Sequence, residues 1–416
     1  MIHLRVWLHP AHHSPGGSPL PVGELIVSDP DPRRGGRLQG EFRYLPEYLG
    51  QREAFALDPI HLPLQTQAFE AGRPHTGIHG IFEDSLPDDW GRRILSRRHQ
   101  LSRAQSRPAN LLRLLGNQAM GALAYTPSDS GPPSAPAMVP VTELSALMVA
   151  ARQFEQAPAN QPPDDLMRLF QAASSPGGAR PKVLVDDHGS GWLVKLASTQ
   201  DRYDMVRIEA ASVAPAQAAG LEVPEHRLID LHGHSALMLR RFDQTPADGR
   251  RHLISLQTLL AADGYYTAGY GDLADIVRRV SDQPEHDLSA LYRQMLFNAA
   301  LGNTDDHLKN FAMLHDDNGW RLTPAYDLLP DVNQRREHIL HFGPVGLMPT
   351  AAAMDQQARV FGISPTTAGA IREQVIDALS RRRRQFSASR VPEHDIQRLD
   401  GSISARLALL SPRSPP

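Results

Sequence analysis

The arrangement of apolar and polar residues predicts strands in the first half of the chain. The segments HLRVWL and GELIVSD, both within the first 30 residues, alternate apolar and polar positions as half-buried strands do. Further along, VLVDD and GWLVKLA flank the turn HGSG, and two alternating segments flank the turn HGH. Each of these pairs predicts an antiparallel hairpin.

Helical periodicity dominates from about residue 253 onward. Leu288, Leu291, Tyr292 and Met295 recur at helical spacing, and Gly302 follows where a glycine commonly ends a helix. We also expect helices over residues 142–156, 164–174, 351–362 and 365–384. An earlier helix is expected to begin near Pro87, with Asp84 or Ser85 as its N-cap and with Trp90, Ile94 and Leu95 on its apolar face.

These elements predict an α+β chain of several segments. We expect an N-terminal subdomain over residues 1–126 and a Pro/Ser/Gly-rich linker over 127–140. A β-rich lobe over 141–245 and an all-helical lobe over 246–416 should follow.

Composition narrows the function classes. The net charge of −3 argues against a general binder of nucleic acid or membrane surfaces. The absence of cysteine excludes disulfides, thiolate zinc sites and cysteine nucleophiles. With no apolar run of membrane-spanning length and no signal-peptide pattern, we expect a soluble, cytoplasmic protein.

The segment GNTDDHLKNFAMLHDDNGWRLTPAYD, residues 302–327, concentrates candidate chemistry. Asp305 and Asn310 are five residues apart, which matches the D-x-x-x-x-N spacing of base and metal ligand in protein kinases. Asp327 follows as a second candidate metal-binding carboxylate. The same acids would suit a metal-dependent hydrolase, although no H-E-x-x-H motif or paired-histidine ligand set accompanies them.

The lysines support a phosphate-binding role. Forty of the 43 cationic residues are arginines, and the three lysines, Lys182, Lys195 and Lys309, all lie within residues 174–195 and 302–327. Lys195 follows the glycine-containing loop SSPGGARPK on an apolar strand, where a lone cation is costly to bury without a partner. Glu209, at the start of the next predicted helix, is a candidate partner, as in the lysine–glutamate pair of kinases.

Together, these ordered motifs resemble the HipA family, the serine/threonine-kinase toxins of bacterial HipBA toxin–antitoxin modules. The resemblance rests on FEDSLPDDWGRR, LLGNQAMGAL, SSPGGARPK, WLVKLAS, RIEAAS, RRFD, GNTDDHLKNFAML and LTPAYDLLP. It implies a protein-kinase-like two-lobed fold with an extra N-terminal subdomain.

The resemblance also implies site residues. Asp305 matches the catalytic base, Asn310 and Asp327 match Mg²⁺ ligands, and Lys195 matches the phosphate-binding lysine. Glu209 would form a structural ion pair. The implied ATP-binding set is Ser175, Pro176, Gly177, Gly178, Ala179, Lys182, Lys195, Arg240, Phe242, Asp243, His307, Lys309, Asn310 and Asp327.

Ser175 matches the loop serine whose autophosphorylation inactivates family members, with Ser174 as the adjacent possibility. Two positions depart from the family pattern. Arg240 replaces the glutamate that often precedes the hinge motif, and Asp306 adds an acid beside the presumed base, with no assigned role.

The resemblance implies a protein kinase that uses ATP and Mg²⁺. Expected substrates are aminoacyl-tRNA synthetases, notably glutamyl-tRNA synthetase, whose phosphorylation would arrest growth. The expected partner is a HipB-like helix-turn-helix antitoxin, with DNA contacted only through it and no membrane association. The alternatives are a kinase of another protein or of a small molecule, and a pseudokinase that acts as a corepressor through a DNA-binding partner.

Overall fold

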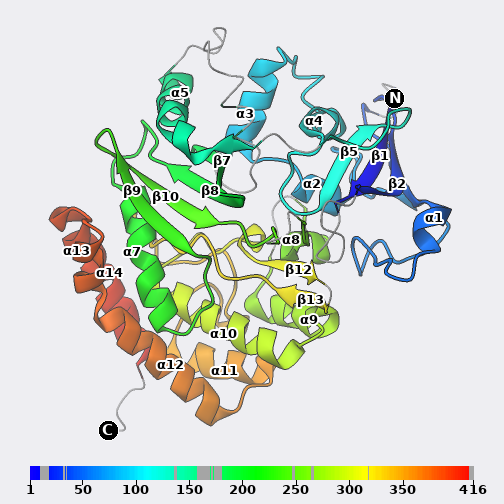
Figure 1. The fold of residues 1–416 in the computed structure, drawn as a ribbon. Coiled ribbons are helices and arrows are strands. Elements are labelled where there is room, and N and C mark those ends of the chain that lie inside the picture. Colours follow the sequence, from blue (N-terminus) through cyan, green and yellow to red (C-terminus); the bar gives the residue numbers. More distant parts are fainter. Residues whose placement is uncertain are drawn as a thin grey trace. The chain divides into compact units, whose positions relative to one another are not determined.

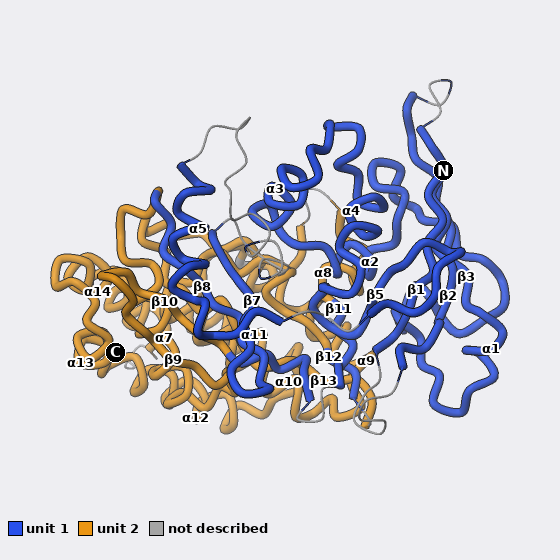
Figure 2. The backbone as a smooth tube through the Cα atoms, turned by 45° about the horizontal axis from the view of Figure 1, so that its top comes forward, with its two compact units in different colours: residues 1–199, 240–254, 314–317 blue, residues 200–239, 255–313, 318–416 orange. Residues whose placement is uncertain are grey.

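The protein forms two compact units, each assembled from separate segments of the chain (Figure 2). The first comprises residues 1–199, 240–254 and 314–317, and the second comprises 200–239, 255–313 and 318–416. The computed structural model describes residues 1–9, 18–30, 33, 35–134, 138–156, 169, 172, 180–245, 249–263, 267–316 and 318–411. Figure 1 labels the elements named below.

A five-stranded sheet organises the N-terminal part of the first unit. Its strands lie in the order β4-β3-β2-β1-β5, and each neighbouring pair is antiparallel. The strands are β1 (Ile2–Leu8), β2 (Leu20–Val27), β3 (Gly40–Tyr44), β4 (Phe69–Glu70) and β5 (Leu123–Pro127). The two predicted N-terminal strands are confirmed as β1 and β2.

The described part of the first unit also contains five α-helices. They are α1 (Pro46–Leu49), α2 (Gly80–Asp84), α3 (Asp89–Arg98), α4 (Pro108–Leu115) and α5 (Leu144–Gln156). The cap predicted for α3 was wrong, because Asp84 ends α2 and Ser85 follows it as that helix's C-cap. Asp88 caps α3 instead, accepting hydrogen bonds from the backbone N–H groups of Trp90 and Gly91 at 3.1 Å.

The second strand group of the first unit carries two of the three lysines. Strand β6 (Val139–Pro140) pairs in parallel with β7 (Lys182–Asp187), which forms an antiparallel hairpin with β8 (Ser190–Leu196). His188 and Gly189 at the turn have φ of 52° and 78°, as a two-residue hairpin turn requires. The predicted hairpin is therefore confirmed, whereas most of the helix expected over 164–174 lies outside the described residues.

The second unit contains most of the remaining helices and one predicted hairpin. The hairpin pairs β9 (His226–Leu231) with β10 (His234–Arg240), as expected around the turn HGH. The helices are α7 (Met205–Ala218), α8 (Leu256–Leu259), α9 (Tyr270–Val280), α10 (Pro284–Leu301), α11 (Ala351–Phe361), α12 (Pro365–Ser380), α13 (Arg382–Ala388) and α14 (Glu393–Leu410).

The expectation of an all-helical C-terminal lobe requires a correction. Three short strands, β11 (His252–Ser255), β12 (Ala312–Asp316) and β13 (Gly319–Leu322), fall within residues 246–416. In the sequence, Asp317 and Asn318 separate β12 from β13, and Asp-Asn-Gly is typical of a tight turn between strands. Across the described residues, every helix is too short or too polar to cross a lipid bilayer.

Three histidines with lowered pKa values predict a stability that depends on pH. Burial lowers the pKa of His9 to about 3, and it lowers the pKa of His79 and of His252 to about 4. The unfolded chain, with a histidine pKa of about 6.5, therefore binds more protons than the folded chain between that pH and the lowered values. The part of the folding stability that these three histidines contribute should be fully present above about pH 6.5. It should fall as the pH drops toward about 4.

We expect the thermal unfolding midpoint to fall steeply between about pH 7 and about pH 5. His79→Phe should flatten this dependence, because the ring packs between Phe42 and Phe82 and a phenyl group fits those surroundings. His188→Gln is the matched control, since its ring is 99% exposed. An equally steep dependence in the His79→Phe and His188→Gln variants would show that His79 does not contribute to it.

Candidate functional site

The predicted catalytic loop follows directly from the end of α10. Gly302 adopts φ 80° and ends the helix in the left-handed conformation that glycine favours. Further along, Asn310 is buried and donates from its side-chain Nδ2 to the main-chain oxygen of Asp305 at 2.8 Å. The predicted base and the predicted metal ligand are thus joined by a hydrogen bond that closes the loop between them.

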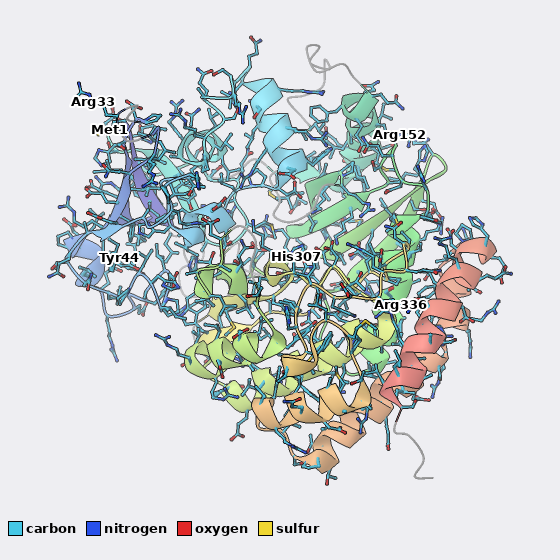
Figure 3. All side chains as sticks on the ribbon, turned by 180° about the vertical axis from the view of Figure 1, so that it is seen from behind. Met1, Arg33, Tyr44, Arg152, His307 and Arg336 are labelled. Carbon is cyan, nitrogen blue, oxygen red and sulfur yellow. The ribbon has the colours of Figure 1, made fainter. Side chains whose placement is uncertain are left out.

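The side chain of Asp305 remains accessible on this closed loop. The residue is exposed, and within the described part of the chain its carboxylate has no hydrogen-bond partner. Lys309 is also exposed, and its main-chain oxygen accepts a bond from the Tyr326 hydroxyl at 2.8 Å. His307, labelled in Figure 3, is half-buried just before the 3₁₀ helix Leu308–Asn310. An accessible carboxylate on a fixed backbone suits proton transfer.

Asp327 is tied to the same loop through Asn303. The buried Asn303 donates from Nδ2 to the main-chain oxygen of Asp327 at 2.9 Å, and the N–H of Asp331 donates to the oxygen of Gly302 at 2.9 Å. Asp327 has φ 54°, a left-handed conformation that is uncommon for residues other than glycine. Sequence reasoning missed Asn303, although a polar residue directly after a helix-ending glycine was a usable signal.

Asp306, the acid without an assigned role, is a buried anchor. Its side chain is 0% exposed. One carboxylate oxygen accepts bonds from the Tyr270 hydroxyl at 2.8 Å and from His338 Nδ1 at 3.0 Å. The other accepts from the backbone N–H groups of Ile339 at 2.9 Å and Leu340 at 3.3 Å. Four donors compensate for the loss of water around the charge.

The tyrosine in this cluster is held in its donating form. Burial raises the pKa of Tyr270 well above its ordinary value, and the neighbouring Asp306 charge raises it further. Asn298 donates to the same hydroxyl at 3.3 Å, which leaves the phenolic proton for Asp306. The two adjacent acids therefore differ in environment, since Asp305 faces solvent and Asp306 fixes the loop to α9 and to residues 338–340.

In the first unit, Lys182 is already engaged within the protein. Its ammonium group lies 2.9 Å from a carboxylate oxygen of Asp88, and the two side chains are only 5% and 9% exposed. Lys182 and Lys195 are direct cross-strand neighbours in the β7–β8 hairpin, so their side chains leave the same face. Asp88 thus compensates one of two adjacent cations, and Lys195 is half-buried beside that pair.

The predicted hinge contains a fully buried ion pair. Arg241 donates to both carboxylate oxygens of Asp243, at 3.0 and 2.6 Å, and Gly121 N–H adds a bond of 2.7 Å. Burial raises the pKa of Asp243, but Arg241 and Gly121 more than offset this, so the pKa lies below its ordinary value. The Asp243 carboxylate, expected to contact nucleotide, is therefore committed to the interior of the first unit. Arg240 is exposed and Phe242 is half-buried.

The predicted phosphate-binding loop lies outside the described residues. Ser175, Pro176, Gly177, Gly178 and Ala179 are outside the described residues, as is Ser174. Glu209 is 8% exposed on α7 of the second unit, whereas Lys195 belongs to the first, and their ion pair stays a prediction.

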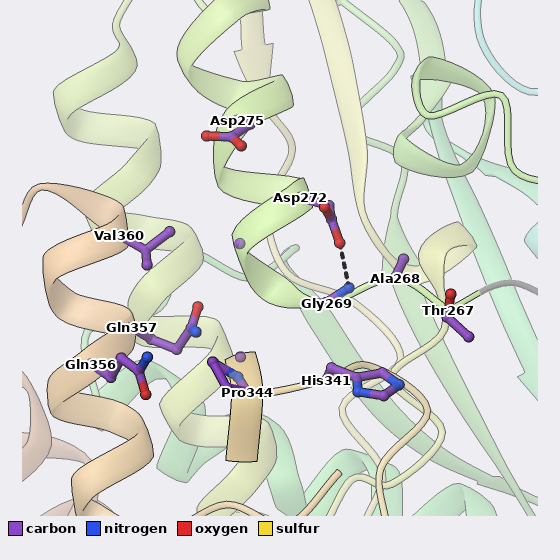
Figure 4. A pocket seen from close by; sticks show the side chains of 12 residues that line it. Thr267, Ala268, Gly269, Asp272, Asp275, His341, Pro344, Gln356, Gln357 and Val360 are labelled. Atoms are coloured by element: carbon purple, nitrogen blue, oxygen red, sulfur yellow. Dashed lines mark hydrogen bonds between the residues drawn. The ribbon is translucent and has the colours of Figure 1, made fainter. Parts of the chain in front are cut away.

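A separate cavity of about 560 Å³ opens in the second unit (Figure 4). Its wall includes Gly269 at the start of α9, Gln357 of α11, and His341. Gly269 and His341 form a backbone bridge just beyond the segment that binds Asp306. None of the sequence-predicted site residues lines this cavity.

The donor chemistry of the loop fits a magnesium ion. The described residues contain no cluster of three or more His, Cys, Asp or Glu side chains that could hold a metal. The predicted set is one carboxylate, Asp327, and one carboxamide, Asn310. The amide nitrogen of Asn310 is used by Asp305, which leaves its oxygen as an acceptor. Mg²⁺ at phosphoryl-transfer sites is commonly held by one or two such oxygens together with substrate phosphates.

Two family models match the chain. The HipA N-terminal domain matches residues 21–126, and the HipA-like C-terminal domain matches residues 174–383. Y4dM and Y4mE of Sinorhizobium fredii, both named as candidate kinases, are each 28% identical. The alignment with Y4dM covers 61% of this chain and 62% of Y4dM, and that with Y4mE covers 71% and 76%.

A relative with a more specific name is the serine/threonine-protein kinase toxin HipA of Shewanella oneidensis. It is 27% identical over 53% of this chain and 55% of its own length. The solved complex of Shewanella oneidensis HipA with HipB and operator DNA contains a chain with a TM-score of 0.68 and 17% identity. That match covers 98% of this chain and 96% of the other, and it shows the same protein-kinase-like fold.

The adjacent acids predict responses of very different size to the same substitution. Asp306→Asn should lower the free energy of unfolding by about 2–3 kcal/mol, because the new amide N–H₂ meets the donors Tyr270 and His338. Asp305→Asn should change it by less than about 0.5 kcal/mol, since that side chain is exposed. Denaturant unfolding of the two isosteric variants measures the difference, and equal destabilisation would contradict the division of roles.

Proposed function

Because the chain belongs to the HipA family, we propose that it is an ATP-dependent serine/threonine-protein kinase. The observation that carries this proposal is the state of the two neighbouring acids. Asp305 is exposed on a loop that Asn310 closes and that the buried Asp306 anchors. The names of the relatives as kinases support the same activity class.

Each proposed role follows from the chemistry of a side chain. The Asp305 carboxylate accepts the proton of a substrate hydroxyl as that oxygen attacks the γ-phosphate. The Lys195 ammonium binds the α- and β-phosphates, and Lys309 contacts the γ-phosphate. Asn310 and Asp327 hold Mg²⁺, which when bound neutralises charge on the phosphates. Asn303 keeps the Asp327 backbone against the catalytic loop, which preserves the spacing of these groups.

We propose further that the kinase is the toxin of a type II toxin–antitoxin module. Its substrate would be an aminoacyl-tRNA synthetase such as glutamyl-tRNA synthetase, and its partner a HipB-like antitoxin that contacts DNA. The support is the name of the Shewanella relative as a toxin and the presence of HipB and operator DNA in the solved complex of similar fold. A phosphoproteome of cells expressing the chain would separate a protein substrate from a small-molecule one.

Loss of the proposed base should remove phosphoryl transfer while leaving nucleotide binding intact. We expect Asp305→Asn to slow transfer from γ-labelled ATP by about 100-fold or more, which is the usual contribution of a positioned base. ATP affinity should stay within about threefold, because the phosphates are held by other residues. Transfer at the wild-type rate would contradict the assignment of Asp305 as the base.

Autophosphorylation of Ser175 would act through charge. A phosphoserine carries about −1.5 to −2 charge, which would repel the nucleotide phosphates from the glycine-containing loop. Ser175→Asp should therefore weaken ATP binding by about tenfold or more, measured by calorimetry, whereas Ser174→Asp should have a smaller effect. Unchanged affinity in Ser175→Asp would rule out this switch, and a larger effect at Ser174 would move the site by one residue.

A further inference from the structure

We propose that Arg406, on the C-terminal helix α14, positions the catalytic loop by holding Asp306 through His338. The proposal rests on the proposed kinase function, because it assigns a role to a residue whose hydrogen bonds, among the described residues, go to His338 and Arg335 and not to Asp305. Arg406 lies beyond residue 383, where the match to the HipA-like C-terminal domain ends.

Arg406 occupies an unusual place on its helix. The buried residues Ile396, Leu399, Ile403 and Leu410 recur at helical spacing along α14, and Arg406 falls on the same stripe with 7% exposure. Burial lowers the pKa of Arg406, while the carboxylates of Asp331 and Asp306 favour its charge. A guanidinium in an apolar stripe costs free energy unless its donors find acceptors.

The acceptors of Arg406 belong to the segment that leads to the Asp306 anchor. Its Nη1 lies 3.1 Å from His338 Nε2, and its Nη2 donates to the main-chain oxygen of Arg335 at 2.5 Å. The opposite ring nitrogen of His338, Nδ1, lies 3.0 Å from the Asp306 carboxylate. A ring with its proton on Nδ1 satisfies both contacts at once, since it donates to Asp306 and accepts from Arg406.

Arg406 also packs directly against the start of the loop. A side chain on Gly302 would place its Cβ 2.7 Å from Arg406 Nε. The glycine that ends α10 therefore allows the guanidinium to lie close to the backbone. Helix α14 itself packs on α10, α11 and α13, and Figure 1 shows it beside α13 at the red end of the chain. Helix α14 thus packs on α10, which leads into the catalytic loop, and through Arg406 it also binds Arg335 and His338.

The planar guanidinium explains why arginine is needed. It presents donors in two directions, one toward the His338 ring and one toward the Arg335 carbonyl. A lysine at this position would keep the charge and could reach one of these acceptors at a time. Arg406→Lys should therefore produce an intermediate defect, whereas Arg406→Met should remove both contacts and leave the apolar stripe complete.

The chain provides a matched control in Arg382. It is 8% exposed and holds α14 through Ser404 and Asp400, and it forms no hydrogen bond or ion pair with the described residues of 302–340. The measurement is amide hydrogen exchange of residues 302–310 in the full-length chain, together with kcat and KM for ATP. Arg406→Met should speed this exchange about tenfold or more and lower kcat about 10- to 100-fold, with KM changed less than threefold. Arg382→Met should lower the unfolding midpoint comparably without either effect.

Two results would overturn the proposal. One is an unchanged exchange rate of residues 302–310 in both Arg406→Met and Arg406→Lys. The other is the same increase in Arg382→Met, which would reduce Arg406 to general support of the helix. The exchange experiment needs no catalytic activity, so it remains decisive even if the wild-type chain transfers no phosphate. A wild-type chain without phosphoryl transfer would count against the proposed function alone.

Discussion

The buried negative charge of Asp306 is the constraint on which the candidate site depends. A carboxylate removed from water is costly unless hydrogen bonds replace the lost hydration. Here the replacement comes from Tyr270 on α9, from His338 and from two backbone N–H groups at residues 339 and 340. These donors can meet only if α9, the catalytic loop and the 338–340 segment take one fixed arrangement.

That arrangement determines how the exposed groups are presented. Since Asp305 is adjacent to Asp306 in sequence, the anchor fixes the backbone from which the accessible carboxylate projects. Asn310 and Asn303 extend the constraint through bonds to the main-chain oxygens of Asp305 and Asp327. Buried polar groups therefore position a small set of accessible ones, which is the usual basis of preorganisation in enzymes.

The sequence predicted those features whose causes are local. The β7–β8 and β9–β10 hairpins follow from alternation around glycine turns, and the end of α10 follows from Gly302. The family resemblance is confirmed by two family models, and the fold by a solved structure of 17% identity. The spacing of Asp305 and Asn310 likewise depends only on neighbouring residues, and their hydrogen bond agrees with it.

Features with distant causes could not be predicted in this way. The burial of Asp306 depends on Tyr270 and His338, which lie 36 and 32 residues away. The partner of Lys182, Asp88, is 94 residues away in the sequence. The hinge role of Asp243 stays a prediction, and its pairing with Arg241 and with the backbone of Gly121 could be seen only in the fold.

A crystal structure of the chain with Mg²⁺ and a non-hydrolysable ATP analogue tests the central claim most directly. The account predicts one Mg²⁺ at about 2.1 Å from side-chain oxygens of both Asn310 and Asp327, with the γ-phosphate facing Asp305. Asp306 should keep its four donors in that complex. A nucleotide bound elsewhere, or an Asp306 carboxylate turned toward the metal, would contradict the assignment of these residues.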